Sequence, residues 1–229
     1  MNAGEIIVYV EGRSDTSAME ALLKPLLQQK RGEGIAIKFL EAPKDGKKKS
    51  ILLKVPLKAA NTILNRPHSV VAAMPDLYPR NVGFEHETFD ELKAGILERF
   101  DRALRDRHVG DDARLRDRFQ VFCFKYDLEA LILASEEALE RQLGVEQLEI
   151  TWRIPVEDQD HDHPPKRIVE KLFEEHGKRV RRYKSTVHAP SILGASDYQD
   201  IADKCPQCFK PFVDFLTNLQ PISYHSESA

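Results

Sequence analysis

Several features that define other protein classes are scarce in this chain. It has only three cysteines in 229 residues, and so small and odd a number favours a reducing compartment over a disulfide-stapled secreted scaffold. No apolar run approaches the roughly 18 residues that a membrane-spanning helix requires. The first five residues, Met1–Glu5, lack the basic and apolar segments of a signal peptide. We therefore expect a cytoplasmic protein with no membrane partner.

An excess of charge of one sign is also missing. The 34 basic and 37 acidic residues leave a formal net charge of −3, so no global field draws the protein onto nucleic acid and any such binding must come from local basic patches. What is present is the composition of an ordinary globular protein, with 41% hydrophobic and 31% charged residues. The length suits one large domain, or one domain with an appendage.

Strand-like and helix-like segments alternate through residues 1–143. Short aliphatic and aromatic runs predict strands at 6–10, 35–40, 68–74 and 119–124. Apolar residues recur at helical spacing over 15–29, 51–64 and 87–107. Alternation of this kind predicts an α/β domain, a mostly parallel sheet flanked by helices.

The remainder of the chain has a different character. Residues 144–165 are polar and contain several prolines, so we expect an extended linking segment. Residues 166–220 return to helical patterns, which predicts a helical C-terminal region packed on the first domain. We expect residues 221–229 to form a disordered tail.

Acidic residues stand just after three of the predicted strands. Glu11 follows the first strand, Asp76 the third and Glu129 the fourth, with Asp15 and Asp127 close by in the sequence. The carboxyl ends of parallel strands share one edge of the sheet, where ligands gather. Mg²⁺ takes a few carboxylates and keeps several waters, so these acids are candidate ligands of a shared cation. The alternative interpretation is that each acid is a helix cap or turn former.

Three short motifs resemble the TOPRIM fold, the metal-binding α/β domain of topoisomerases, primases and overcoming-lysogenization-defect nucleases. They are VEGRSD at 10–15, MPDLY at 74–78 and YDLEAL at 126–131. More narrowly, the chain resembles a family of uncharacterised TOPRIM-like proteins that are often encoded beside ATPase genes and linked to phage defence. That family also has C-terminal motifs like those at 166–168, 190–193 and 205–209.

The resemblance implies site residues and a reaction. It makes Glu11, Asp76 and Glu129 catalytic, and it implies that Mg²⁺ or Mn²⁺ is bound by Glu11, Asp76, Glu129, Asp127 and Asp15. The implied activity is a metal-dependent phosphodiesterase or nuclease that acts on DNA or RNA with an ATPase partner. Tyr78, however, stands where the wider superfamily has a second aspartate. This departure keeps open an alternative, a catalytically inactive TOPRIM-like adaptor that docks on a partner protein.

Basic residues near these motifs are candidates for contact with nucleic acid. The candidates are Arg13, Lys47, Lys48, Arg181 and Arg182. The first lies one turn after Glu11, where a guanidinium could hold a phosphate or pair with an acid on the surface. The lysines belong to a basic loop and the other arginines to a cluster around Tyr183, where a ring could stack on a base. Each cluster can also be read as a solvated charged surface. The sequence does not decide the oligomeric state, and a homodimer is one possibility.

Two further patterns have the spacing of metal ligands. Two residues separate Cys205 from Cys208, but structural zinc needs four ligands and the chain has no second such pair. We expect these cysteines to pack beneath a helix that begins at Pro206. Asp and His alternate over residues 158–163, and we interpret that segment as a polar loop.

Overall fold

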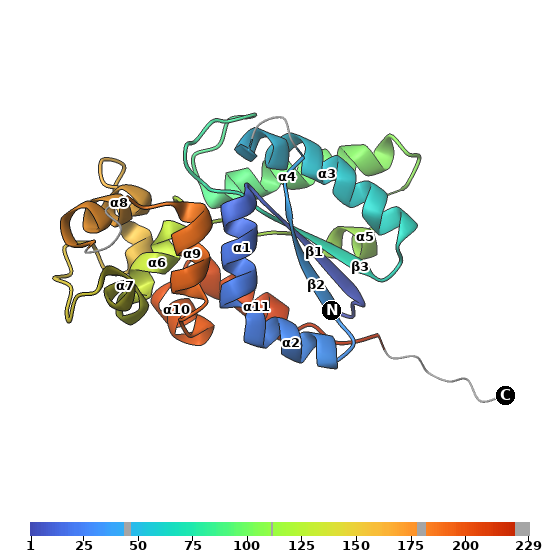
Figure 1. Cartoon of the computed structure of the whole chain (residues 1–229). Helices are drawn as coiled ribbons and strands as arrows, with labels where there is room; N and C mark the ends of the chain where they lie inside the picture. Colours follow the sequence, from blue (N-terminus) through green and yellow to red (C-terminus); the bar gives the residue numbers. More distant parts are fainter. Residues whose placement is uncertain (44–46, 111, 178–181, 223–229) are drawn as a thin grey trace.

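A four-stranded parallel sheet forms the centre of the molecule (Figure 1). The computed structural model describes residues 1–43, 47–110, 112–177 and 182–222. The strands lie in the order β2 (Ala36–Glu41), β1 (Glu5–Val10), β3 (Ser69–Met74) and β4 (Phe119–Val121). Every neighbouring pair is parallel. The prediction of an α/β fold with a mostly parallel sheet is confirmed.

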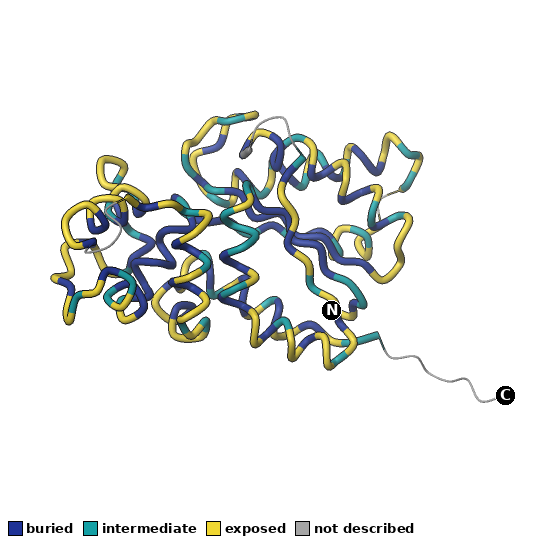
Figure 2. The backbone as a smooth tube through the Cα atoms, viewed as in Figure 1, coloured by how far each residue is buried: buried dark blue, intermediate teal, exposed yellow. Residues whose placement is uncertain are grey.

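The two central strands are apolar because both of their faces are covered. All six residues of β3 are buried, as are the last five of β1. Strands that are covered on both sides read as continuous apolar runs rather than as alternating ones. The edge strand β2 is mostly exposed, and Figure 2 shows the contrast between the buried centre of the sheet and its surroundings.

Helices cover the two faces of the sheet. One face packs on α3 (Lys47–Asn65) and α4 (Phe89–Arg105), with α5 (Ala113–Asp117) beside β4. The other face packs on α1 (Arg13–Leu22), α2 (Lys24–Gly32) and helices from the C-terminal half of the chain. Side chains of the strands alternate between the two cores: Ile7 and Val71 face the first, while Ile6 and Val70 face the second.

The C-terminal half of the chain is helical. Its elements are α6 (Glu129–Ala134), α7 (Glu136–Leu143), the 3₁₀ turn η1 (Val156–Asp158), α8 (Pro165–His176), α9 (Ser185–Leu193), α10 (Tyr198–Lys204) and α11 (Phe209–Thr217). Helix α9 packs on α1, and α8 packs on α6. The buried Lys30 Nζ of α2 donates to the carbonyl oxygens of Thr217 (2.7 Å) and Leu219 (2.9 Å). These contacts join the end of the described chain to its first helices.

Several expected boundaries differ from the structure. The single helix expected over 15–29 is two helices, because the chain turns at Leu23 and Pro25 stands in the first turn of the second. Helix α9 contains Pro190 and lacks a clear apolar stripe, so periodicity did not predict it. Helix α11 begins at Phe209 rather than at Pro206. Of the expected tail, residues 223–229 lie outside the described residues.

Within the described ranges, none of the helices combines the length and the apolar character that crossing a bilayer requires.

Candidate active site

The strand order creates a crevice between β1 and β3. The chain leaves β1 for β2 on one side and continues to β3 on the other, so the two central strands flank a topological switch point. Ligands of open α/β sheets bind outside the carboxyl ends of the strands at such a point. Glu11 follows β1 and Asp76 follows β3. The backbone N–H of Asp76 donates to Glu11 Oε1 at 3.1 Å, which ties the two strand ends together.

The loop after β1 adds a second carboxylate from the same segment. Asp15 lies in the first turn of α1, and its Oδ2 accepts a hydrogen bond of 2.9 Å from the backbone N–H of Gly12. The hydroxyl of Ser14 donates to its other oxygen at 3.4 Å. The positive end of the helix dipole favours a carboxylate at this position. The capping role considered for these acids therefore applies to Asp15, which caps the helix and still faces the crevice.

The segment after β4 brings two more acids to the same edge. Phe124 pairs with the β3 loop, donating to Pro75 O at 3.0 Å and accepting from Leu77 N at 2.7 Å. This pairing carries Asp127 and Glu129 alongside Asp76. Oδ2 of Asp127 accepts from the backbone N–H of Lys166 at 3.3 Å. Its Oδ1 is buried without a hydrogen-bond partner among the described residues.

All five acids named from the sequence line one cavity of about 140 Å³. Its lining comprises Glu11, Gly12, Ser14, Asp15, Asp76, Asp127, Leu128, Glu129, Lys166 and Ser185. The last two belong to helices α8 and α9 of the C-terminal half. Neither was named as a site residue from the sequence, because nothing in the linear order says which C-terminal helix reaches the crevice.

Three of the carboxylates in this cavity, those of Asp76, Asp127 and Glu129, resist ionisation. Burial raises the pKa of Asp76 well above its usual range, and the negative charges of the other four acids raise it further. Burial and the charge of Glu129 raise the pKa of Asp127 to about 8. Burial also raises the pKa of Glu129, although the positive charge of Lys166 opposes this effect. The fold thus concentrates more negative charge here than its own cations offset.

The donor chemistry of this cavity fits a hard divalent cation. Mg²⁺ and Mn²⁺ prefer carboxylate and water oxygens, and a cation would relieve the repulsion that raises these pKa values. As placed, however, no three or more His, Cys, Asp or Glu side chains of the described ranges form a group that could hold an ion. Mg²⁺ keeps several of its waters when it binds to proteins, so a few direct carboxylate ligands suffice.

Lys48 lies inside the protein, which corrects the prediction that it contacts nucleic acid. Helix α3 begins at Lys47, earlier than expected, and turns Lys48 inward to 5% exposure. Its Nζ donates to the carbonyl oxygens of Leu77, at 2.5 Å, and Pro79. Burial lowers the pKa of Lys48 to about 8, against the opposing effect of the Glu11 and Asp76 charges. Lys48 therefore holds the loop after Asp76 by hydrogen bonds to its carbonyl groups, and its positive charge interacts with Glu11 and Asp76.

The other basic candidates remain predictions. Arg13 is the first residue of α1 and is exposed, and Arg182 is exposed as well. Lys47 begins α3, but its side chain lies outside the described part of the structure, as does all of Arg181.

Tyr78 is part of an aromatic cluster beside the crevice. Its ring stacks on Tyr126 with centroids 4.6 Å apart, and the His161 ring stands nearly perpendicular to it with centroids 4.3 Å apart. The Arg80 guanidinium lies 4.6 Å over the same ring. The side chain that replaces the expected second aspartate therefore packs against Tyr126 and His161. It contributes no carboxylate to the site.

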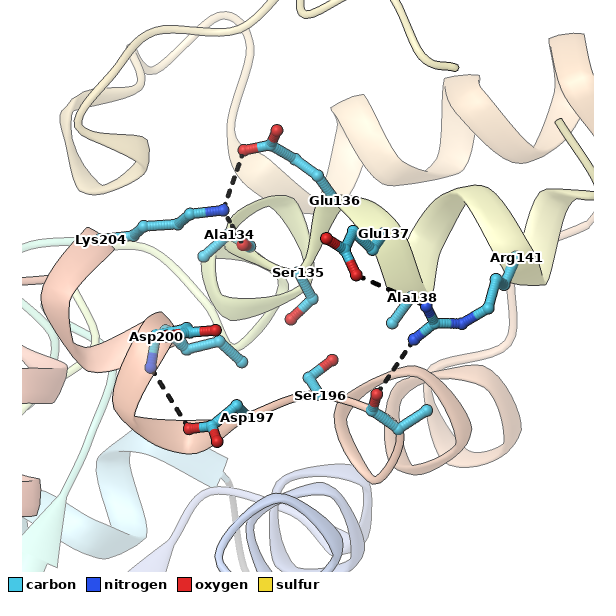
Figure 3. A pocket seen from close by; sticks show the side chains of 12 residues that line it. Ala134, Ser135, Glu136, Glu137, Ala138, Arg141, Ser196, Asp197, Asp200 and Lys204 are labelled. Atoms are coloured by element: carbon cyan, nitrogen blue, oxygen red, sulfur yellow. Dashed lines mark hydrogen bonds and ion pairs between the residues drawn. The ribbon is translucent and has the colours of Figure 1, made fainter. Parts of the chain in front are cut away.

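A second cavity, drawn in Figure 3, has a different character. It measures about 190 Å³ and lies between the α6–α7 turn and the α9–α10 turn. Lys204 Nζ pairs with Glu136 at 3.3 Å and donates to Ala134 O at 3.0 Å. Arg141 donates to Ala195 O at 3.1 Å. These cations therefore already have partners within the cavity wall.

Replacing Asp127 by Asn is expected to stabilise the metal-free protein at pH 8. The pKa of Asp127 is about 8 in the fold against roughly 4 in an unfolded chain. The folded state therefore binds more protons across this window, and stability falls as the pH rises through it. We expect the free energy of unfolding of the variant to exceed that of the parent by about 1–3 kcal/mol at pH 8 and by little at pH 4. Urea unfolding in the presence of a metal chelator measures this difference, with Glu149→Gln, a change at an exposed residue, as the control. A variant less stable than the parent at pH 8 contradicts the assignment.

Lys48→Met should change how stability depends on alkaline pH. The pKa of Lys48 is about 8 in the fold against 10.5 for a free lysine, so the unfolded chain binds more protons between these values. Stability of the parent therefore rises with pH across that window, and the variant lacks this contribution. Between these two pKa values, we expect the free energy of unfolding of the parent to rise by about 1–3 kcal/mol relative to that of the variant. Lys49→Met, at the exposed neighbouring position, should track the parent. Parallel curves for parent and Lys48→Met would show that Lys48 is not buried as a cation.

The chain is similar to solved structures over nearly its whole length. Among solved structures, it is similar to the C-terminal region of the Burkholderia pseudomallei OLD protein, with 16% identity and a TM-score of 0.47 over 95% of this chain and 98% of that one. It is also similar to the C-terminal region of the Xanthomonas campestris pv. campestris OLD protein, with 14% identity and a TM-score of 0.41 over 94% and 97% of the two chains. No curated protein matches it. A domain of unknown function, DUF4276, matches residues 10–217, a span that includes all five acids. The chain belongs to the DUF4276 family.

Proposed function

We propose that this protein is a metal-dependent phosphodiesterase of the TOPRIM type, and specifically a nuclease. The observation that carries the proposal is the single cavity at the switch point, where Glu11, Asp76 and Glu129 converge with Asp15 and Asp127. Five carboxylates in so small a space are costly to the fold unless a cation shares the site. The motif resemblance to TOPRIM domains supports the same function from the sequence.

A divalent cation would supply two effects when bound, the activation of a water and the stabilisation of charge on a phosphodiester oxygen. Glu11 and Asp76 are the residues that would hold it, because they meet at the two central strand ends. The Asp76 N–H fixes the Glu11 carboxylate at 3.1 Å. Lys166 is exposed and lines the same cavity, so its ammonium can meet an anionic phosphate at the entrance. Glu129 is 4% exposed and is suited to holding a proton rather than to meeting solvent.

The inactive adaptor is the second candidate function. Two observations favour it: Tyr78 supplies no carboxylate, and as placed no three acids of the described residues form a metal-holding group. Against it stands the electrostatic cost of the cavity, because a docking module has no need of carboxylates that resist ionisation. The two candidates differ in whether metal binding depends on the acids.

The broader setting rests on the resemblance to the TOPRIM-like family. We place the protein in bacterial defence against phage, acting on nucleic acid in the cytoplasm with Mg²⁺ or Mn²⁺ and an ATPase partner. Arg13 and Arg182 are the exposed basic residues available for the nucleic-acid backbone. A homodimer is compatible with this setting.

Metal binding and cleavage should both depend on Glu11 and Asp76. We expect calorimetric titration with Mn²⁺ to show binding in the parent protein and none in Glu11→Gln or Asp76→Asn. With DNA and RNA substrates, each variant should lose about 100-fold or more of the Mg²⁺-dependent cleavage rate. Circular dichroism should show an intact fold, and Glu149→Gln should behave as the parent. If the parent binds no metal, the adaptor is the correct interpretation. Cleavage at the parent rate by a variant that combines Glu11→Gln with Asp76→Asn would refute the nuclease site.

A further inference from the structure

Two cysteines that are far apart in the sequence face each other across the join between the sheet and the C-terminal helices. The Sγ atoms of Cys123 and Cys208 lie 3.7 Å apart, and the residues are 85 positions apart. Cys123 follows β4 and is 2% exposed, while Cys208 immediately precedes α11 and is partly exposed. We propose that Cys123 and Cys208 form a reversible disulfide when the protein meets a peroxide oxidant. This inference does not rest on the proposed nuclease activity.

Both backbones are held so that the sulfurs stay opposed. On the sheet side, Phe122 N donates to Ala73 O at 2.9 Å and Phe124 N donates to Pro75 O at 3.0 Å. On the helix side, the backbone N–H of Cys208 donates to the Glu157 carboxylate at 2.8 Å. A disulfide has an S–S distance of about 2.0 Å, so the sulfurs need to approach by less than about 2 Å.

Cys205 is not the natural partner despite its C-x-x-C spacing. Its side chain packs in the core that contains α1 and α9, whereas Cys123 and Cys208 pack against the core on the α3–α4 face. Cys205 is fully buried, and burial raises the pKa of its thiol well above the usual range. Solvent oxidants therefore reach Cys208 first, and the sulfur that Cys208 then contacts is that of Cys123.

The chemistry balances with hydrogen peroxide as the oxidant. The Cys208 sulfur forms an S–O bond as the O–O bond breaks, which gives a sulfenic acid and one water. The Cys123 sulfur then attacks the sulfenic sulfur, and the S–S bond forms as the S–O bond breaks. The Cys123 proton leaves with the hydroxyl as a second water. Two electrons pass from the thiols to the peroxide. The neighbouring Cys208 and burial raise the pKa of Cys123, so Cys123 carries the proton that the departing hydroxyl takes up as the S–S bond forms.

The bond would join the segment after β4, which pairs with the loop that carries Asp76, to the start of α11. The residues on either side of Cys123, Phe122 and Phe124, both bond to the end of β3 next to Asp76. A disulfide at Cys123 therefore connects the strand end that positions Asp76 to the helix that packs under the sheet. Oxidation should stabilise this join, because a cross-link over a long loop restricts the unfolded chain.

Peptide mapping of the full chain tests the proposal. The reduced protein is treated with hydrogen peroxide, quenched, digested without reductant and analysed by mass spectrometry. We expect one peptide pair joined through Cys123 and Cys208, with a free Cys205 thiol. Cys205→Ser should form the same bond, and Cys208→Ser should form none. The melting temperature of the parent and of Cys205→Ser should rise by about 5 °C on oxidation and return with dithiothreitol, while that of Cys208→Ser should not rise.

Other products would overturn the inference. A bond between Cys205 and Cys208, a disulfide between two chains, or irreversible oxidation of Cys208 without a cross-link would each show that the sulfurs do not pair. Recovery of three free thiols from the treated parent would show the same. The Cys208→Ser variant replaces one sulfur with oxygen at a partly exposed position, and its folding is checked by its melting temperature before oxidation.

Discussion

Repulsion among carboxylates is the constraint on which the rest of this structure depends. Glu11, Asp15, Asp76, Asp127 and Glu129 line one small cavity, and the local fold is organised to tolerate their charge. Three of them accept a backbone hydrogen bond, from the N–H groups of Asp76, Gly12 and Lys166. Lys48 approaches from the protein interior and Lys166 from the cavity wall. These partners reduce the repulsion without removing it, because the pKa values of the buried acids remain raised. Carboxylates with raised pKa values are typical of functional sites.

The sequence could predict which acids meet because they follow strands. A strand of aliphatic residues fixes its own direction in a parallel sheet, and the residue after it must emerge at the carboxyl edge. Glu11 and Asp76 could be placed in this way. Predicting that Glu11 and Asp76 lie close together also requires knowing that β1 and β3 are neighbours. That is a property of the strand order rather than of either strand. The same holds for Glu129, which reaches the site because β4 pairs with β3.

The residues that could not be predicted depend on helix boundaries and on distant packing. Lys48 belongs to a run of lysines that looks like a solvated loop, but helix α3 starts within that run and directs this one side chain inward. Helix α9 carries Pro190 and no clear apolar stripe, because the polar His188 lies on its buried side while the apolar Val187 is 56% exposed. Tyr78 shows from the sequence that an acid is missing, but the stacking of its ring on Tyr126 depends on the tertiary fold.

The C-terminal helices are part of the site rather than an appendage to it. Lys166 at the start of α8 and Ser185 at the start of α9 complete the cavity wall. Helix α9 also packs along α1, whose first turn holds Asp15. A movement of α9 would therefore shift a wall residue and, through α1, one of the acids. Cys208 at the start of α11 faces the strand-end segment that positions Asp76. The cavity thus combines acids from strand ends and from the first turns of α1 and α6 with wall residues from α8 and α9, so its properties depend on how the sheet and the helices are joined.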